Sequence, residues 1–145
     1  MKGRFETFTV LINKISRNIR KIKNQEMAEY ELRSTHVSCL YYLYVAESLT
    51  ATELCERCEE DKATISRAVD HLETNGYAVC EAKSSKRYNS RIMLTDKGRT
   101  VGKEICDKVN LILDEVGDGL SDEERVEFYR CLAIISDNLE RVTRS

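Results

Sequence analysis

The chain has 145 residues, no proline, six glycines and six cysteines, and its formal net charge is −2. This length suits one domain with a hydrophobic core, or a small domain extended by dimerising helices, and it excludes two large domains. No apolar run approaches the roughly 20 residues that a membrane span needs, and the charged start lacks the apolar region of a secretory signal. We therefore expect a cytoplasmic protein with no membrane partner.

Charge is distributed very unevenly along the chain. The net charge is +6 over residues 1–23, −6 over residues 24–60, +3 over residues 61–99 and −5 over residues 100–145. Residues 83–99 alone carry +5. A polyanion would therefore meet a local basic surface, and the acidic segments elsewhere would limit its non-specific affinity.

Apolar side chains recur at helical spacing along much of the chain, which predicts a mainly α protein. The first expected element is a long amphipathic helix over about residues 4–24, and its apolar stripe needs a partner. The stripe consists of Phe5, Phe8, Ile12, Ile15, Ile19 and Ile22. A second helix is expected to be capped by Ser34 or Thr35 and to end near Glu47 or Ser48.

A short helix and a tight turn are predicted next. Thr50 and Glu53 form a capping-box pattern, with the hydroxyl reaching the Glu53 amide and the carboxylate reaching back, and the helix that they open should end near Cys58. Glu59-Glu60 is the expected turn. Asp61 then follows as the cap of another helix.

This next helix is predicted to have a buried and a polar face, and to end at Asn75-Gly76. Its inward face should consist of Ile65, Ala68, Val69 and Leu72. Its outward face should consist of Lys62, Thr64, Ser66, Arg67, Asp70 and His71. A short helix, a tight turn and a second helix with a polar outer face are the arrangement that enters a DNA major groove.

Two β-type runs, residues 77–82 and 90–95, flank a basic stretch that contains Lys83, Lys86 and Arg87. The pattern predicts a two-stranded hairpin with a cationic tip, so the central part of the chain should be a winged helix-turn-helix. The cationic tip suits phosphate or minor-groove contacts, and the alternative is a solvated loop.

Two long helices complete the chain. Thr95 or Asp96 should start the first, Gly117 and Gly119 break it, and a capping box at residues 121–124 starts the second. Apolar stripes at both chain ends predict that helices over about 4–24 and 96–144 dimerise, flanking a winged helix over about 34–98. On this prediction residues 1–145 form a single domain.

Two segments carry a family resemblance: TATELCERCEEDKATISRAVDHLETNGYAV and the wing end RIMLTDKG, which leads into a long helix. With them the sequence resembles the multiple antibiotic resistance regulator (MarR) family of bacterial transcription factors. The resemblance implies a homodimer held together by the terminal helices, with the helix over 61–75 in the major groove. It also implies that the wing tip contacts the DNA backbone or the minor groove, and that a pocket between the dimer helices and the winged helix takes a small anionic or aromatic ligand.

The residues expected to bind DNA come from the helix over 61–75 and from the wing. They are Lys62, Thr64, Ser66, Arg67, His71, Lys86, Arg87 and Arg91. Three departures from the family pattern affect this set. Glu59 stands where the family often has glycine, Glu60 follows where it often has an apolar residue, and the wing lacks the usual Asp-x-Arg arrangement. Arg87 lies one residue further from Leu94 than the usual wing arginine, so either the wing is one residue longer or its contact is shared with Arg91.

The cysteines are expected to be free and mostly buried, because they are spread through amphipathic segments of a chain without an export signal. Cys55-x-x-Cys58 is interpreted as part of the core, and the alternatives are a thiol sensor or a metal site. No second Cys or His pair stands at ligand spacing to complete four-coordination, so we expect neither a metal nor a cofactor.

Tyr30, His36 and Tyr41 are candidates for an effector pocket, although His36 also suits a capping or surface role. No serine or cysteine has a histidine at motif spacing and no glycine-rich phosphate loop is present, so an enzyme is not expected. The sequence predicts a homodimeric transcriptional repressor that binds a palindromic operator in double-stranded DNA. A small aromatic or anionic effector is expected to release it from the operator. The alternatives are a winged-helix protein-protein interaction module and a thiol-based redox-sensing regulator.

Overall fold

The computed structural model describes residues 3–81 and 90–144. The chain divides into two compact units, Met1–Cys106 and Asp107–Ser145. Over the described ranges, no helix is long and apolar enough to cross a membrane.

The first unit begins with a nearly continuous helical segment, which confirms the first predicted helix. A π-helical stretch η1 (Glu6–Leu11) runs into α1 (Ile12–Glu26), and a 3-10 turn η2 (Ala28–Tyr30) follows. The apolar stripe of this segment is largely exposed within the single chain, with Phe5 at 77% and Ile19 at 49%. The stripe is therefore an apolar surface that suits a partner.

The second helix, α2 (Ser34–Ala46), ends where the sequence predicted but starts differently. Arg33 is its N-cap residue, so the predicted cap at Ser34 or Thr35 is wrong. The backbone N–H of Arg33 donates to His36 Nδ1 at 3.0 Å, and that of Ser34 donates to Asn24 Oδ1 at 2.7 Å. These two side chains, one of them on α1, satisfy free amide groups at the start of α2.

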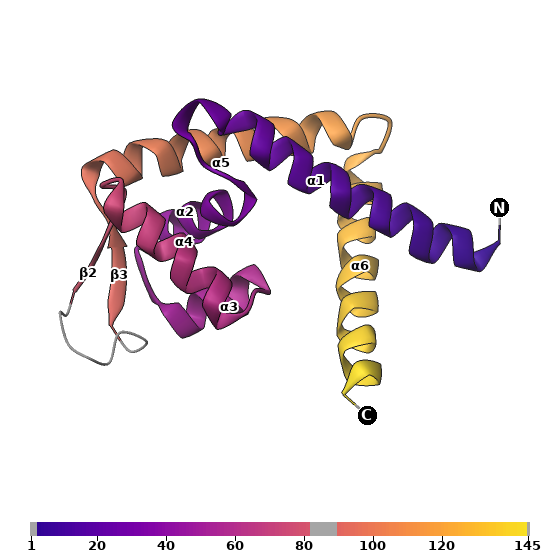
Figure 1. The fold of residues 1–145 in the computed structure, drawn as a ribbon. Coiled ribbons are helices and arrows are strands. Elements are labelled where there is room, and N and C mark those ends of the chain that lie inside the picture. Colours follow the sequence, from indigo (N-terminus) through magenta and orange to yellow (C-terminus); the bar gives the residue numbers. More distant parts are fainter. Residues whose placement is uncertain (1–2, 82–89, 145) are drawn as a thin grey trace. The chain divides into compact units, whose positions relative to one another are not determined.

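The helix-turn-helix consists of α3 (Ala51–Cys58) and α4 (Lys62–Thr74), as predicted (Figure 1). Thr50 Oγ1 accepts from the Glu53 N–H at 3.2 Å, and Asp61 Oδ1 accepts from the Thr64 N–H at 2.7 Å. The latter contact lowers the pKa of Asp61, so the cap is a carboxylate at neutral pH. Both predicted caps are therefore confirmed.

Glu59 forms the turn between α3 and α4 in the left-handed conformation, with φ 54° and ψ 46°. This conformation favours glycine because a β-carbon crowds the backbone there. Glu59 thus adopts the left-handed backbone conformation that glycine would adopt most easily at this position.

The winged part contains a three-stranded antiparallel sheet in the order β1-β3-β2. Its strands are β1 (Ser48–Thr50), β2 (Ala78–Cys80) and β3 (Arg91–Leu94), and Figure 1 shows β2 beside β3. The two predicted wing strands are confirmed. The sequence missed β1, because three residues between two helices carry no detectable period. The wing-tip residues Lys83, Lys86 and Arg87 lie outside the described residues.

The core of the first unit forms where α2, α3, α4 and the sheet meet. All four side chains predicted for the inward face of α4 are buried, and Leu72 and Ile65 are fully inaccessible. Further buried side chains come from the neighbouring elements: Val37, Cys39, Leu40, Leu43, Leu54 and Ile92. Burial of this apolar surface holds α4 in place and leaves its opposite face outward.

The long helix α5 (Asp96–Val116) ends at Gly117, as predicted, and α6 (Asp122–Thr143) belongs to the second unit. The capping box at the start of α6 is confirmed. The Glu124 N–H donates to Ser121 Oγ at 3.1 Å, and the Ser121 N–H donates to Glu124 Oε1 at 3.2 Å. Reciprocal bonds of this kind satisfy two of the free amide groups at a helix start.

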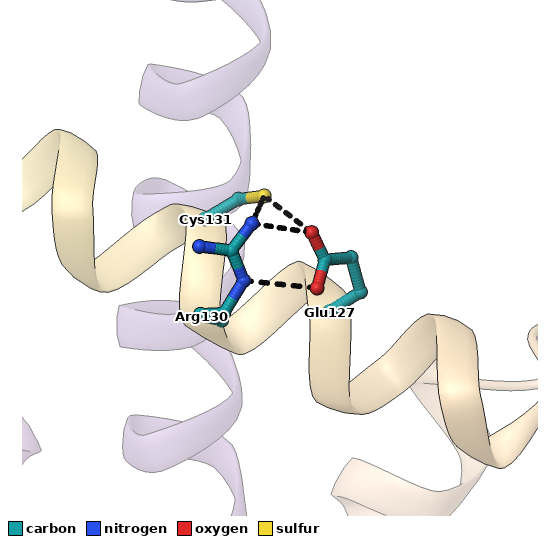
Figure 2. Close-up of polar contacts among 3 residues, drawn as sticks. All are labelled: Glu127, Arg130 and Cys131. Atoms are coloured by element: carbon teal, nitrogen blue, oxygen red, sulfur yellow. Dashed lines mark hydrogen bonds and ion pairs between the residues drawn. The ribbon is translucent and has the colours of Figure 1, made fainter.

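A bidentate ion pair lies on α6 (Figure 2). Arg130 donates through Nε at 2.9 Å and through Nη2 at 2.5 Å to the two carboxylate oxygens of Glu127. The Cys131 thiol donates to the same carboxylate at 3.6 Å. The arginine lowers the pKa of Glu127, and a pair at this i, i+3 spacing supports the helix locally.

Candidate nucleic-acid interface

The outward face of α4 presents four polar residues from its first two turns. Lys62 and Arg67 are exposed, whereas Thr64 and Ser66 are half-buried. Arg67 Nη2 donates to Thr64 Oγ1 at 3.5 Å, so the guanidinium lies along the helix surface. These side chains offer a cation, a guanidinium fork and two hydroxyl groups, which are the groups that contact phosphates and base edges in DNA. The structure places them together, and their contact with DNA stays a prediction.

His71 differs from the other four predicted residues of α4. Its ring stacks on that of His36, with 4.2 Å between centroids and 13° between planes. The contact joins the last turns of α4 to the first turn of α2. The histidine ring is thus engaged within the protein, and its role in DNA binding remains untested.

His36 is held as a neutral imidazole. Burial, His71 and Arg33 together lower the pKa of His36 from 6.5 to about 4, with burial the largest cause. Nδ1 accepts the backbone N–H of Arg33, so a proton on this ring belongs on Nε2. Sequence reasoning placed His36 in an effector pocket or at a cap, and the observed contact with Arg33 is of the capping kind.

The lowered pKa predicts a pH dependence of stability. A histidine whose pKa falls on folding stabilises the protein fully above the unfolded value of 6.5, and this contribution is lost as pH falls towards about 4. His36→Gln keeps an acceptor for the Arg33 N–H and does not titrate. We expect the wild type to lose more unfolding free energy than this variant between pH 7 and pH 4. Urea unfolding at several pH values measures the difference, and parallel pH profiles would contradict it.

Arg91 is a strand residue with several protein contacts. Its Nε donates to Ser48 Oγ at 2.8 Å and its Nη2 to the Ser48 carbonyl at 2.9 Å. Its Nη1 lies 3.7 Å from Glu53 Oε1. The Glu53 carboxylate therefore pairs with Arg91. It does not make the predicted reciprocal bond to the Thr50 N–H, so only one half of that capping box forms. Arg91 joins β1 and α3 to the wing, and its contact with DNA stays a prediction.

Thr95, Lys97 and Gly98 connect the end of α4 to the base of the wing, and we call this group the Thr95–Gly98 clamp. Thr95 Oγ1 donates to the Gly76 carbonyl at 2.6 Å and accepts from the Gly98 N–H at 3.1 Å. Lys97 Nζ donates to the Asn75 carbonyl at 2.8 Å. The sequence predicted Thr95 as a possible start of the long helix and used Lys97 and Gly98 only as part of the motif RIMLTDKG, without contacts to Asn75 or Gly76. A threonine followed three positions later by glycine, at a strand-to-helix junction, could have predicted the bond from the Gly98 N–H to Thr95 Oγ1.

The Thr95–Gly98 clamp also has a close backbone contact and a ring contact. A β-carbon at position 98 would lie 2.0 Å from the Tyr77 carbonyl oxygen, so only glycine fits. The Lys97 ammonium lies 4.4 Å from the centroid of the buried Tyr77 ring. Such a cation–π contact adds a modest attraction.

The three residues predicted for an effector pocket make separate contacts in the structure. Tyr30 Oη donates to Glu104 Oε2 at 2.6 Å, and this bond raises the pKa of Tyr30 to about 12. Tyr41 packs its edge against Tyr42, and His36 stacks on His71. Each residue thus takes part in a separate contact.

A cavity of about 340 Å³ lies at the carboxyl end of α2 and the start of α5. Its lining residues are Leu43, Tyr44, Val45, Glu47, Leu94 and Arg99. This volume is within the range of small-molecule sites. The sequence predicted none of these lining residues, because they come from three separate segments.

All six cysteines are free, as expected, but only Cys39 is buried and the other five are half-buried. The thiols are therefore less buried than the sequence predicted, and this holds for Cys55 and Cys58 as well. Hydrogen bonding to Cys58 and burial raise the pKa of Cys39, and the same contact lowers the pKa of Cys58. Within residues 3–81 and 90–144, no group of three or more His, Cys, Asp or Glu side chains could hold a metal ion.

The fold and this polar face define a winged helix-turn-helix protein. A family model described as the MarR family matches residues 30–87. A curated relative, an HTH-type transcriptional regulator of Bacillus subtilis called YwoH, is 26% identical over 117 residues, covering 81% of this chain and 85% of the relative. The chain is therefore similar to MarR-family winged-helix proteins, as the sequence resemblance indicated.

Solved structures give the same fold. A MarR protein from Peptoclostridium difficile has a TM-score of 0.85 at 22% identity, and the match covers 97% of this chain and 92% of that chain. A MarR-family regulator from Silicibacter pomeroyi has a TM-score of 0.76 at 26% identity, covering 88% and 86%. The MepR protein in an S. aureus MepR–DNA complex has a TM-score of 0.80 at 18% identity, covering 91% and 97%.

Proposed function

We propose that this protein is a homodimeric transcriptional repressor that binds a roughly palindromic operator in double-stranded DNA. The observation that carries the proposal is the polar outward face of α4, where Lys62, Thr64, Ser66 and Arg67 lie opposite the buried Ile65 and Leu72. The basic sequence of residues 83–99, with a net charge of +5, also favours a polyanionic partner. The similarity to MepR, whose structure was solved with DNA, supports the same use.

Exposed apolar side chains on the terminal helices support a dimer. Just before η1 and along η1 and α1, four apolar side chains are more than 40% exposed: Phe5, Phe8, Ile15 and Ile19. On α6 the same holds for Val126, Tyr129 and Leu139. Apolar stripes of this extent are rarely left in water, and a second copy of the chain offers identical ones. In a dimer on DNA, the two copies of α4 would enter successive major grooves, roughly 34 Å apart.

Release of the operator by a small aromatic or anionic effector is the regulatory part of the proposal. The 340 Å³ cavity at the end of α2 offers the Arg99 guanidinium for an anion and the Tyr44 ring for an aromatic group. The cavity is lined in part by Leu94, the last residue of β3, and the Thr95–Gly98 clamp begins at the next residue. A ligand there would release DNA only if it bound one arrangement of the winged helix more tightly than another.

Selection from a random duplex library, followed by a gel shift with excess competitor DNA, tests the proposal. We expect enrichment of an inverted repeat, and a complex with two chains on one duplex. A protein that binds all sequences equally, or none, would contradict sequence-specific regulation and favour a winged-helix module for protein-protein contact.

The effector is tested with the same complex. Benzoate, as a small aromatic anion, is expected to dissociate the wild-type complex and to lose this effect in Arg99→Gln. If benzoate dissociated the wild-type and Arg99→Gln complexes equally, it would act at a site other than this cavity.

A further inference from the structure

The carboxyl end of α4 is anchored by residues about twenty positions later in the chain. The carbonyl groups of Asn75 and Gly76 follow the last turn of the helix, where backbone acceptors have no partner within the helix. Lys97 and Thr95 supply the missing donors, at 2.8 Å and 2.6 Å. Since these donors come from the start of α5, the bonds constrain how α4 lies against the elements that follow it.

The same residues also hold the base of the wing. The Thr95 N–H donates to the Tyr77 carbonyl at 3.0 Å, and the Tyr77 N–H donates to the Leu72 carbonyl at 2.8 Å. Tyr77 directly precedes β2, and Thr95 directly follows β3. The Thr95 hydroxyl and the Lys97 ammonium thus link the end of α4 to the first turn of α5. The Thr95 backbone N–H extends this link to Tyr77, at the base of the wing.

The chemistry of the link suits this anchoring role. The carboxyl end of a helix carries partial negative charge, so the Lys97 ammonium is attracted there. The Thr95 hydroxyl uses both of its capacities, donating to Gly76 and accepting from Gly98. Loss of either group would leave the local fold intact and loosen the angle between α4 and the wing.

We propose that Thr95 and Lys97 are positioning residues for DNA binding, which hold α4 and the wing in the one relative placement that lets both contact a single duplex. The inference rests on the proposed function and deepens it. Neither residue needs to touch DNA. Their effect falls on the geometry with which Arg67 and the wing meet the operator.

Threonine variants test the hydroxyl. Thr95→Val removes both of its hydrogen bonds at nearly constant shape, and Thr95→Ser retains them. Thr100→Val is the matched control, because the Thr100 hydroxyl donates only within α5, to the Asp96 carbonyl at 3.1 Å. Fluorescence anisotropy on the selected operator is expected to give a dissociation constant about five- to tenfold higher for Thr95→Val than for the other two variants.

A lysine variant tests the ammonium and separates positioning from direct contact. Lys97→Met keeps the apolar stem and removes the charge. We expect an operator affinity about five- to tenfold weaker, little change on non-specific DNA, and an unchanged slope of log Kd against log salt. A residue that itself binds a phosphate would instead reduce that slope by about one.

These measurements distinguish a positioning role from a loss of stability and from a direct contact with DNA. All measurements are made at a temperature where circular dichroism shows every variant to be folded, so a mere loss of stability leaves the affinity unchanged. Equal affinities of Thr95→Val and Thr100→Val, or a reduced salt slope for Lys97→Met, would overturn the positioning role. Absence of sequence preference in the wild type would instead remove the proposed function, and the inference with it.

Discussion

Gly98→Ala is expected to lower the free energy of unfolding by about 3 kcal/mol, one of the largest effects of any single methyl group in this chain. The added carbon would meet the Tyr77 carbonyl oxygen at 2.0 Å, well inside van der Waals contact. Because the obstacle is backbone, relief requires α5 to move away from β2 and break the Thr95–Gly98 clamp. The gain that alanine usually brings in a helix is about 1 kcal/mol and does not offset this strain.

Two other glycines supply graded controls. A β-carbon at Gly102 would lie 2.9 Å from the Tyr44 β-carbon, a smaller overlap than the one at Gly98, so Gly102→Ala should cost less. Gly3 has nothing within 4 Å, and Gly3→Ala should be neutral. Urea unfolding at one fixed protein concentration checks the order, since dimerisation makes stability depend on concentration. Equal stability of Gly98→Ala and Gly3→Ala would show that the close approach at Gly98 is not rigid.

Arg67→Ala is expected to weaken operator binding by about 1 to 3 kcal/mol at fixed salt. Arg67 is exposed on α4 and lies against Thr64, where its guanidinium can reach either a base edge or a phosphate. Loss of base reading would relax the sequence preference at one position of each half-site. Loss of a phosphate contact would weaken binding to all sequences and reduce the salt slope by about one.

Arg67→Lys separates the two uses of the arginine. Lysine keeps the charge but lacks the planar fork, so it should restore a phosphate contact and fail to restore bidentate base reading. Arg141→Ala, on α6, is the control for loss of one positive charge. Anisotropy titrations on the selected operator and on single-site variants give both quantities. Unchanged affinity of Arg67→Ala, with the dimer intact, would remove this residue from the interface.

The sequence predicted best those features that depend on neighbouring residues. The caps at Thr50, Asp61 and Ser121 were correct because each bond spans only three positions. The buried face of α4 was correct because helical periodicity alone assigns it. Local rules of this kind were enough to predict the helix-turn-helix.

Features that depend on distant residues were missed or only half predicted. The start of α2 was misplaced because Asn24 of α1 serves the Ser34 amide. Arg91 was expected at the DNA, and no local pattern could show that Ser48 and Glu53 surround it. The stacking of His71 on His36 joins two helices far apart in sequence. A period or a motif carries no information about such partners.

The left-handed Glu59 bears on how proteins of this kind are found. A residue with a side chain in this conformation costs roughly 1 kcal/mol or more relative to glycine. The turn nevertheless has the geometry that glycine would give it, because the packing of α3 and α4 on either side imposes it. A search pattern that demanded glycine in the helix-turn-helix turn would reject this chain, although its backbone satisfies the pattern completely.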